Sequence, residues 1–498
     1  QSATGDLLKI QQTIKRSTPA PVDFMLGNSN GVAVRSVFNV AGLAQVDFHR
    51  QVSTTAAPAK PDCPQPISAL FAVGPTVQQV AYGRFESPQY QNAGKVIPPT
   101  ATLTGAPVAQ GSQPLVFQLF LPAGPKPAGG WPVALFGHGF TDSMYGAPWA
   151  VASVFAQRGI ATLSINVVGH GGGAQGFLNV QPAGGATAVT VLAGGRGIDQ
   201  DGNTVIDSTE GVNAAAPATI VSSRDGLRQT VVDLMQLVRQ VEAGIDVDAD
   251  GSRDLDPARI YYAGQSFGGI YGTMLLGVEP NIKAGVPNVP GGSITEIARL
   301  SPSFRVLTGL SLLLRQPSLL NLPPNQPLPV PFNFNENIPL RDQPPLVNTV
   351  PGAMAIAELL DRNEWVQQSG NPVSYAAMIR QQPLSGSAAK PVIVQVAKGD
   401  QTVPNPTSTA IVRAGALQDR TTYFRNDLAF GTVPGASKNP HVFLTNLLAT
   451  PTVAVAAQTQ IAVFFASNGA MVIDPDGTGP LFEVPISGDL PEVLNFIP

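Results

Sequence analysis

The sequence predicts an α/β fold in which a mostly parallel central sheet is covered by helices on both faces. Two observations predict it. From residue 115 onward, short apolar segments of strand length alternate with segments whose apolar residues recur at helical spacing. One of these strands leads directly into Gly264-Gln265-Ser266-Phe267-Gly268, and a helix follows, so this serine occupies a tight strand-to-helix turn.

The expected elements follow one another in a regular order. A helix is expected at residues 7–15 and strands at 32–40 and 44–48, ahead of the regular alternation. The clearest helix spans residues 223–241, whose apolar positions have a period of about 3.6 and which Ser222 or Ser223 can cap. The other expected strands are 115–121, 132–136, 160–168, 259–263, 392–396 and 421–424, and the other expected helices are 147–158, one starting at Phe267, one around 354–360, and 458–467.

Two segments interrupt the alternation. Residues 172–222 form a Gly-rich insertion with acidic loops, and residues 295–385 hold a Leu/Pro-rich stretch, whose dense prolines forbid long helices, followed by a helix. The second segment has the character of a cap or lid. We therefore expect an N-terminal extension at 1–75, a first part of the core at 76–294 that contains the insertion, the cap at 295–385, and a second part of the core with the C-terminal tail at 386–498.

Composition excludes several classes of protein. Only 12% of the 498 residues are charged, and 29 Lys and Arg face 33 Asp and Glu, so no basic surface for nucleic acid can be built. The single cysteine, Cys63, rules out an intrachain disulfide, a multi-cysteine zinc site and an iron–sulfur cluster. No apolar run approaches the roughly 18 residues that a transmembrane segment needs. The start at Gln1, without an initiator methionine, indicates a processed mature chain or a trimmed one. Together with the low charge it favours an exported protein, secreted or at a bacterial cell surface, whose signal peptide is already absent, and we expect a monomer.

Ser266 needs a base, because a serine hydroxyl is a poor nucleophile by itself. In hydrolases with this strand-to-helix turn, the order along the chain is serine, acid, histidine. The chain has four histidines, His49, His138, His170 and His441, and only the last follows Ser266. His441 is therefore the candidate base, chosen by elimination, although a lone histidine in an apolar setting can also be a buried core residue.

The acid is expected between Ser266 and His441, at the end of a strand. Asp400 follows the apolar strand 392–396 and the turn at Gly399, which makes it the best candidate. Asp361, after a helix of the cap, and Asp427, closer to His441, are rivals that do not end a core strand as well. An aspartate in a solvated turn is the alternative interpretation of Asp400.

The same chemistry needs hydrogen-bond donors for an oxyanion. One candidate is the backbone N–H of Phe267, directly after the serine. The other is the N–H of Phe140, in the turn Gly137-His138-Gly139-Phe140 that follows the strand 132–136. A catalytic role for His138 competes with this interpretation, but His-Gly at a strand end is more simply explained by backbone geometry, and His170 in the matching loop is interpreted in the same way.

Taken together, four motifs resemble those of the α/β-hydrolase superfamily: His138-Gly139, Gly264–Gly268, the run from Asp400 to Pro404, and Pro440-His441. The resemblance covers roughly residues 110–300 and 385–470, and within the superfamily the chain is similar to bacterial secreted esterases and lipases. It implies ester hydrolysis through an acyl-enzyme and no organic cofactor. It does not extend to the first 75 residues or the cap, so it does not identify the substrate.

Two acidic loops indicate a second chemistry, calcium binding. The first, residues 199–210, has oxygen donors at EF-hand spacing, but Thr204 stands where an EF-hand has glycine and no clear helix flanks the loop. The second, residues 246–256, keeps Gly251 at that position but has Pro257 in place of the last acid. The candidate ligands are Asp199, Asp201, Asn203, the Val205 carbonyl, Asp207 and Glu210 in the first loop, and Asp246, Asp248, Asp250, the Ser252 carbonyl and Asp254 in the second.

Solvated Asx turns are the alternative for both loops. The second loop is the better calcium candidate, and because it enters the strand that carries Ser266, an ion there would be structural and would fix the turn from below.

The leading functional hypothesis is a serine ester hydrolase acting on a small molecule, lipid or polymer ester with an apolar acyl or aromatic part. The alternatives are a serine peptidase or amidase on the same fold, which also forms an acyl-enzyme, and a non-catalytic binding protein that retains the fold. We expect residues 300–350 to cover the site and set selectivity. Its apolar residues can form a wall for substrate or an ordinary cap core: Phe304, Val306, Leu307, Leu310, Leu312, Leu313, Leu314, Leu319, Leu320 and Leu322.

Overall fold

The central sheet has the architecture that the sequence predicts. The computed structural model describes residues 3–55, 62–102, 104–213, 215, 218–321, 334–336 and 350–498. A ten-stranded sheet has the order β16-β15-β14-β13-β12-β8-β9-β7-β6-β3. The strands from β15 through β12 and β8 to β9 run parallel, whereas β7, β6 and β3 at one edge and β16 at the other pair antiparallel.

The bounds of these strands agree with the predicted segments where the sequence pattern is regular, and three strands, β6, β13 and β16, are additional. The strands are β3 (Val37–Asn39), β6 (Val77–Gln89), β7 (Gly111–Pro122), β8 (Trp131–Gly137), β9 (Ala161–Ile165), β12 (Leu255–Gln265), β13 (Ile282–Asn288), β14 (Val394–Ala397), β15 (Thr421–Phe424) and β16 (Phe482–Glu483).

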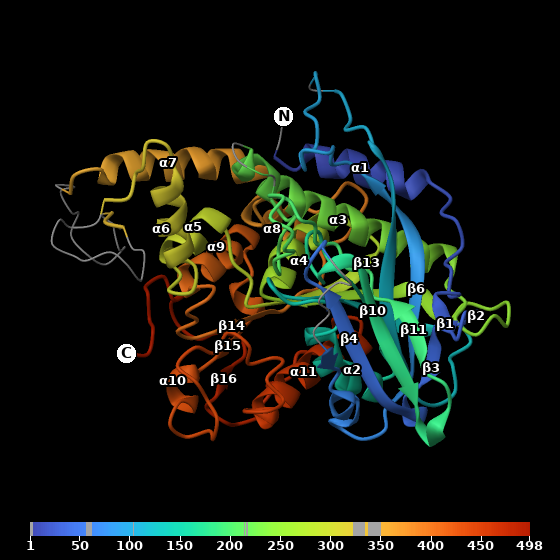
Figure 1. Cartoon of the computed structure of the whole chain (residues 1–498). Helices are drawn as coiled ribbons and strands as arrows, with labels where there is room; N and C mark the ends of the chain where they lie inside the picture. The colour runs from blue at the N-terminus through green and yellow to red at the C-terminus, as the bar shows by residue number, and fades with distance from the viewer. Residues whose placement is uncertain are drawn as a thin grey trace.

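Helices cover both faces of the sheet, because side chains along each parallel strand alternate between two apolar cores. On β12, Ile260 and Tyr262 pack in the core that also holds α1, α3, α4 and α8, and Tyr261 and Ala263 pack in the core that holds α2 and α11. Figure 1 shows the first group above the sheet and the second below it. The helices are α1 (Gly5–Arg16), α2 (Ala147–Gln157), α3 (Thr219–Ala243), α4 (Phe267–Val278), α8 (Val373–Arg380), α9 (Asn405–Gly415), α10 (Asn426–Ala429) and α11 (Pro451–Ala466).

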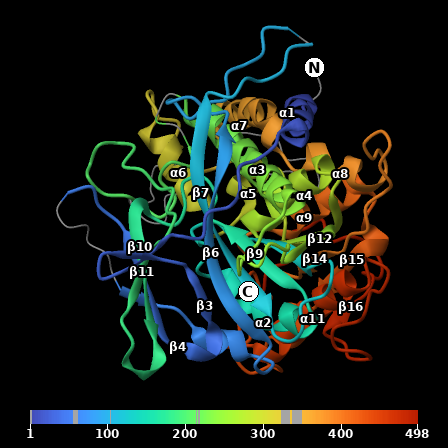
Figure 2. The ribbon, with the colours of Figure 1, turned by 90° about the vertical axis from the view of Figure 1, so that its right-hand side faces the viewer.

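A second, antiparallel sheet joins the N-terminal extension to the first insertion. Its order is β2-β1-β11-β10-β4-β5, so strands from residues 27–64 enclose two strands from residues 173–192. Val46 and Leu178 of this sheet share a core with Phe120 and Trp149 of the main body, and Figure 2 shows the sheet beside the β6–β7 edge. The strands are β1 (Gly27–Ser29), β2 (Val32–Val34), β4 (Leu43–Gln51), β5 (Asp62–Pro64), β10 (Gly173–Pro182) and β11 (Val189–Leu192).

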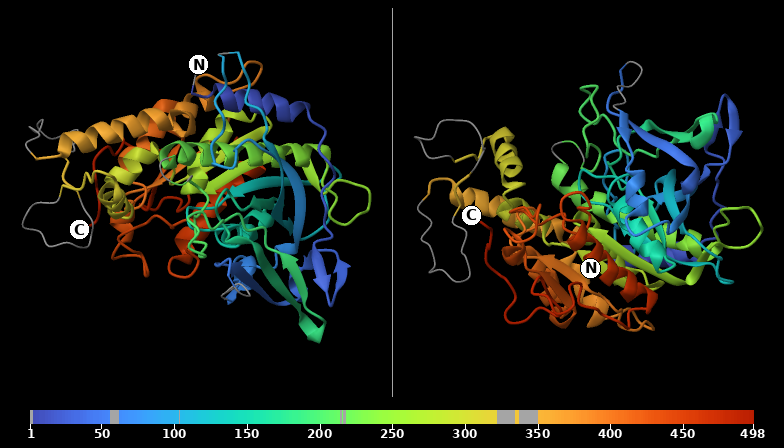
Figure 3. Two further views of the ribbon diagram at one scale, coloured as in Figure 1. Left: turned by 45° about the horizontal axis from the view of Figure 1, so that its top comes forward. Right: turned by 90° about the horizontal axis from the view of Figure 1, so that it is seen from below.

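Of the predicted cap at 295–385, the described residues up to 370 form a small helical unit at the opposite end of the molecule from the second sheet (Figures 1 and 3). The predicted cap extends too far, because α8 at residues 373–380 packs with α4 in the main core. Its helices are α5 (Ile294–Leu300), α6 (Arg305–Leu314) and α7 (Ala353–Gln367). Leu312 packs against Phe334, and the buried carboxylate of Glu336 pairs with Arg299 and Arg305 at 2.8 Å each. Among the described helices, none alone has the length and hydropathy to cross a membrane, although α5 and α6, bent by 99°, pass that test as a pair.

Candidate active site

Ser266 lies on a sharp turn between β12 and α4, as the sequence predicts. Its φ of 59° is a conformation that non-glycine residues rarely adopt, and its N–H donates to the carbonyl of Asn288 on the neighbouring strand at 2.9 Å. The flanking glycines are required by close backbone approach. A Cβ atom at Gly268 would lie 2.1 Å from the carbonyl oxygen of Gly137, and one at Gly264 would lie 2.5 Å from the carbonyl oxygen of Gly268.

The structure brings the three predicted residues into one hydrogen-bonded chain. His441 Nε2 lies 2.7 Å from Ser266 Oγ, and His441 Nδ1 lies 2.7 Å from Asp400 Oδ2. A carboxylate only accepts hydrogen bonds, so Nδ1 carries the proton and Nε2 is left with a lone pair facing the serine. His441 is 7% exposed and Asp400 is 1% exposed, so the chain is shielded from water except at the serine.

Backbone donors fix the carboxylate of Asp400. Its Oδ1 accepts hydrogen bonds from the N–H groups of Thr402 and Val403 at 2.8 Å each, which leaves Oδ2 for the histidine. The rival aspartates do not reach the site. Asp427 pairs with Arg425 and Lys398, and hydrogen bonding from Arg425 lowers its pKa to about 2, whereas Asp361 lies on the exposed side of α7.

Two polar residues that the sequence did not single out hold the three loops together. Asn439 Oδ1 accepts from the N–H of His441 at 3.3 Å and from the N–H of Gln401 at 3.1 Å, which joins the base to the acid loop. Gln265, beside the serine, donates to the carbonyl of His441 at 3.2 Å. In the sequence, Gln265 directly precedes Ser266 and Asn439 directly precedes Pro440-His441, but these positions alone do not predict the contacts.

The two predicted oxyanion donors flank Ser266. Phe267 is the first residue of α4, Phe140 follows β8, and their rings lie 5.5 Å apart. Neither backbone N–H donates a hydrogen bond to another described residue, so both are free for a ligand. A Cβ atom at Gly139 would lie 4.0 Å from Ser266 Oγ, which places the Phe140 loop next to the hydroxyl.

The three remaining histidines lie outside the hydrogen-bonded chain of Ser266. His138 and His170 are fully buried, and burial lowers their pKa values to about 4 and about 3, so both are neutral at physiological pH. His49 stacks on Phe177 in the second sheet, with ring centroids 4.5 Å apart. The interpretation of His138 and His170 as residues that serve backbone geometry agrees with their hydrogen bonds to backbone groups.

A cavity of about 870 Å³ opens beside Ser266 and His441. One wall comes from the N-terminal extension, residues 63–72, which includes the short 3-10 helix Ile67–Phe71, and another from residues 442–455 before and at the start of α11. Lysine and arginine are absent from its described lining, and Asp142 is the only carboxylate there. The described lining therefore carries little charge.

The described part of the 295–385 insertion contributes less to this cavity than we expected from the sequence. Of its described residues only Phe304 lines the cavity. Leu312 is buried in the small core of the insertion, with Leu319 and Leu320 packed against that core, whereas Leu307 and Leu314 point to solvent. These leucines are cap core or surface, and Leu322 lies outside the described residues.

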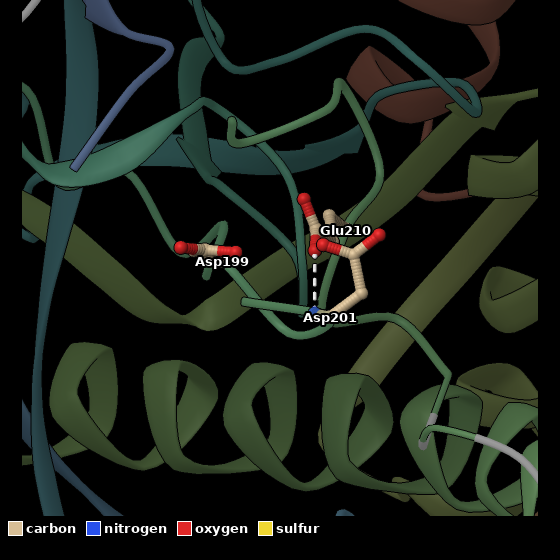
Figure 4. A group of neighbouring side chains, drawn as sticks. All are labelled: Asp199, Asp201 and Glu210. Carbon is tan, nitrogen blue, oxygen red and sulfur yellow. Dashed lines mark hydrogen bonds between the residues drawn. The ribbon is translucent and has the colours of Figure 1, made fainter. Parts of the chain in front are cut away.

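The first acidic loop gathers three of its predicted ligands. Carboxylate oxygens of Asp199, Asp201 and Glu210 lie within 4.8 Å of one another, and Figure 4 shows the three side chains on one loop. Thr204 takes a φ of 72°, so it adopts the left-handed conformation that glycine supplies in an EF-hand loop. Oδ1 of Asp199 is buried without a hydrogen-bond partner in the described structure, and no described cation pairs with the three carboxylates. These residues fit a calcium ion.

The second acidic loop already has a counter-ion from the protein. Lys126 Nζ lies 2.9 Å from Asp254, 3.3 Å from Asp250 and 3.8 Å from Asp248. Asp246 instead accepts the N–H of Gly251 at 2.9 Å. Carboxylate oxygens of Asp246, Asp248 and Asp254 also lie within 4.8 Å of one another. Because the Lys126 ammonium group already compensates the carboxylates of this second loop, we favour the first loop as the calcium candidate, although the sequence analysis favoured the second.

The strand order of the central sheet and the sharp turn at Ser266 between β12 and α4 identify the fold. The chain has the α/β-hydrolase fold. No protein-family model matches the chain, and no curated protein matches its sequence. Similar solved structures include an acetyl xylan esterase from Paenibacillus sp. R4, which is 14% identical with a TM-score of 0.36 over 74% of this chain and 79% of that chain.

Two further solved structures show the same distant likeness. An acylaminoacyl peptidase from Pyrococcus horikoshii is 11% identical with a TM-score of 0.44 over 89% of this chain and 52% of that chain. An esterase from Pyrobaculum calidifontis is 13% identical with a TM-score of 0.30 over 72% of this chain and 83% of that chain. At these identities the likeness concerns the fold, and the substrate has to be argued from the site.

Proposed function

We propose that the protein is a serine hydrolase that cleaves carboxylic esters with an apolar acyl or aromatic part through an acyl-enzyme. The observation that carries this proposal is the unbroken hydrogen-bonded chain from Asp400 through His441 to Ser266, with 2.7 Å at each step. A neutral imidazole whose Nε2 faces a serine hydroxyl is a general base already in place.

The reaction follows from this arrangement. Ser266 Oγ attacks the ester carbonyl carbon while His441 Nε2 takes the hydroxyl proton, and Asp400 stabilises the resulting imidazolium. The carbonyl oxygen becomes an oxyanion that the N–H groups of Phe140 and Phe267 receive. The tetrahedral intermediate collapses, the ester C–O bond breaks, and the alcohol leaves with the proton from His441. Water, deprotonated by His441, then releases the acid from Ser266 by the same steps, and no organic cofactor is needed.

The cavity supports an apolar ester more than a peptide. Its described lining offers no lysine or arginine for a peptide carboxylate and consists largely of small and apolar side chains, among them Pro66, Ala69, Ala150, Leu447 and Val455. We assign selectivity for the acyl or alcohol group to the walls formed by residues 63–72 and 442–455, since the described part of the insertion lines the cavity only through Phe304.

The test is a p-nitrophenyl ester series of increasing acyl length, run beside aminoacyl p-nitroanilides, with wild type and Ser266→Ala. Hydrolysis of esters that depends on Ser266, with little cleavage of anilides, is the expected result. Preferential anilide cleavage favours the peptidase alternative, and the absence of both activities favours a binding protein that retains the fold.

The first acidic loop supports a second, structural proposal. Asp199, Asp201 and Glu210 would hold one calcium ion with the other oxygens of that loop, and none of these three residues lines the cavity beside Ser266. Export of the chain and its monomeric state remain predictions from the sequence.

A further inference from the structure

Two buried histidines link the loop after β8 to the loop after β9 by reciprocal hydrogen bonds. His138, on the first loop, accepts the N–H of Val167 on the second loop at its Nε2, over 3.2 Å. His170, on the second loop, accepts the N–H of Thr141 on the first loop at its Nε2, also over 3.2 Å. Each loop therefore supplies one backbone donor and one imidazole acceptor to the other.

The partners of the rings fix their tautomers. Nδ1 of His138 lies 2.9 Å from the carbonyl oxygen of Gly139, and Nδ1 of His170 lies 2.9 Å from the carbonyl oxygen of Val168. A carbonyl only accepts and a backbone N–H only donates, so each ring carries its proton on Nδ1 and a lone pair on Nε2. A protonated ring would oppose one N–H to another, and the complete burial of both rings keeps them neutral.

These bonds fall on the two peptide units that meet at Phe140. The carbonyl of Gly139, held by His138, belongs to the same planar unit as the N–H of Phe140. The N–H of Thr141, held by His170, belongs to the next unit, and Thr141 has a φ of 70°, a conformation that an L-residue keeps only when its surroundings enforce it. With both units held, the direction of the Phe140 N–H is fixed. A hydrogen bond to the Gly139 carbonyl also polarises that N–H and makes it a better donor.

Phe267, the other predicted oxyanion residue, is in contact with the His170 ring. His170 stacks on Phe267, with centroids 5.7 Å apart and planes at 27°, and packs edge-on against Phe140 with centroids 5.5 Å apart. His170 therefore contacts both residues whose backbone N–H groups are the predicted oxyanion donors.

We propose that His138 and His170 are positioning residues that together orient the Phe140 N–H toward the oxyanion formed at Ser266. Neither ring touches the reacting atoms. The inference rests on the proposed serine hydrolase function and adds to it a pair of residues that determine how well the oxyanion is stabilised.

The test compares two variants that differ in which half of the His170 interaction they keep. His170→Gln places an amide oxygen near the position of Nε2 and can accept the Thr141 N–H. His170→Asn can still donate to the Val168 carbonyl but is too short to reach Thr141. We expect kcat to fall about 10–100-fold in His170→Asn, with KM changed less than about 3-fold, because a misaimed donor weakens only the transition state. His170→Gln should recover most of kcat.

Two further measurements separate positioning from stability. An alkyl boronic acid, whose adduct with Ser266 places an oxygen in the oxyanion position, should lose affinity in His170→Asn by a factor similar to the loss in kcat, while the melting temperatures of the two variants agree. Imidazole ¹⁵N NMR of the wild type should show two neutral rings protonated at Nδ1, and this result does not depend on activity.

Several results would overturn the proposal. Either ring protonated at Nε2, equal kcat for the Asn and Gln variants, or a fall in kcat that follows melting temperature would each remove the positioning role. Wild-type protein that hydrolyses no ester and reacts with no boronic acid would instead overturn the proposed function on which this role rests, so the two failures are distinguishable.

Discussion

Replacing Asp400 by asparagine tests how much of the chemistry depends on the tautomer of His441. The N–H groups of Thr402 and Val403 donate to Oδ1 at 2.8 Å each, so the amide oxygen of the variant must take that place. The amide NH₂ then faces His441 Nδ1 at the position of Oδ2, where the native distance is 2.7 Å. Two donors cannot share this contact, so the ring moves its proton to Nε2 and can no longer accept the serine proton.

The expected loss follows from that change. A triad with the wrong histidine tautomer loses ~10⁴-fold in kcat, equivalent to about 5 kcal/mol of transition-state stabilisation. Stopped assays with p-nitrophenyl butyrate measure it, with thermal melting to show that the variant is folded. Asp361→Asn is the matched control, because it makes the same chemical change on the exposed side of α7. Asp400→Asn with more than a tenth of wild-type kcat would refute the assignment of Asp400.

The remaining predictions concern the cavity, the loops and pH. Gly139→Ala places a methyl group 4.0 Å from Ser266 Oγ without a backbone clash, so kcat/KM should fall at least ~10-fold while the melting temperature is kept. Ala69→Phe should shorten the preferred acyl chain, whereas Leu307→Ala on α6 should not; an unchanged profile in both would remove the wall assignment. Calcium should raise the melting temperature of wild type but not of Glu210→Gln, and superimposable curves for wild type would mean that the first loop is only a turn. Burial lowers the pKa of His170 from 6.5 to about 3, so as pH falls this histidine is protonated in the unfolded chain before it is protonated in the folded one. Between these two pH values the free energy of unfolding of wild type should fall by up to ~1.4 kcal/mol per pH unit relative to that of His170→Gln. A difference between the two free energies of unfolding that stays constant with pH, measured by chemical denaturation, would contradict this.

The sequence was sufficient for the core because its signals there are local. The strands before Ser266 and Asp400 are short apolar runs that end in glycine turns, and His441 was the only histidine after Ser266. By contrast, β13 reads Ile-Lys-Ala-Gly-Val-Pro-Asn, and its glycine and proline argue against a central strand. β13 is nevertheless a central strand, because it pairs with β12 on one side and β14 on the other.

Strand pairings between segments far apart in the chain could not be predicted from the sequence. The second sheet joins β4 to β10, whose residues are more than a hundred positions apart, and a Gly-rich segment carries no pattern that specifies its partner. Two other long-range contacts could not be predicted for the same reason. Lys126, in the loop between β7 and β8, pairs with the carboxylates of the second acidic loop, and residues 63–72 form one wall of the cavity. The spacing of the acidic residues indicated which oxygens lie together in each loop, but it did not indicate that Lys126 is the cation that pairs with the second loop.

Covalent labelling of Ser266 tests the central claim most directly. Incubation with an alkyl fluorophosphonate, trypsin digestion and mass spectrometry locate the adduct, and the tryptic peptide 260–283 contains Ser266 as its only serine. The account predicts one adduct per chain, on Ser266, formed in step with the loss of esterase activity and absent from Ser266→Ala. An adduct on another residue that tracks the loss of activity, or Ser266→Ala hydrolysing esters at the wild-type rate, would contradict it.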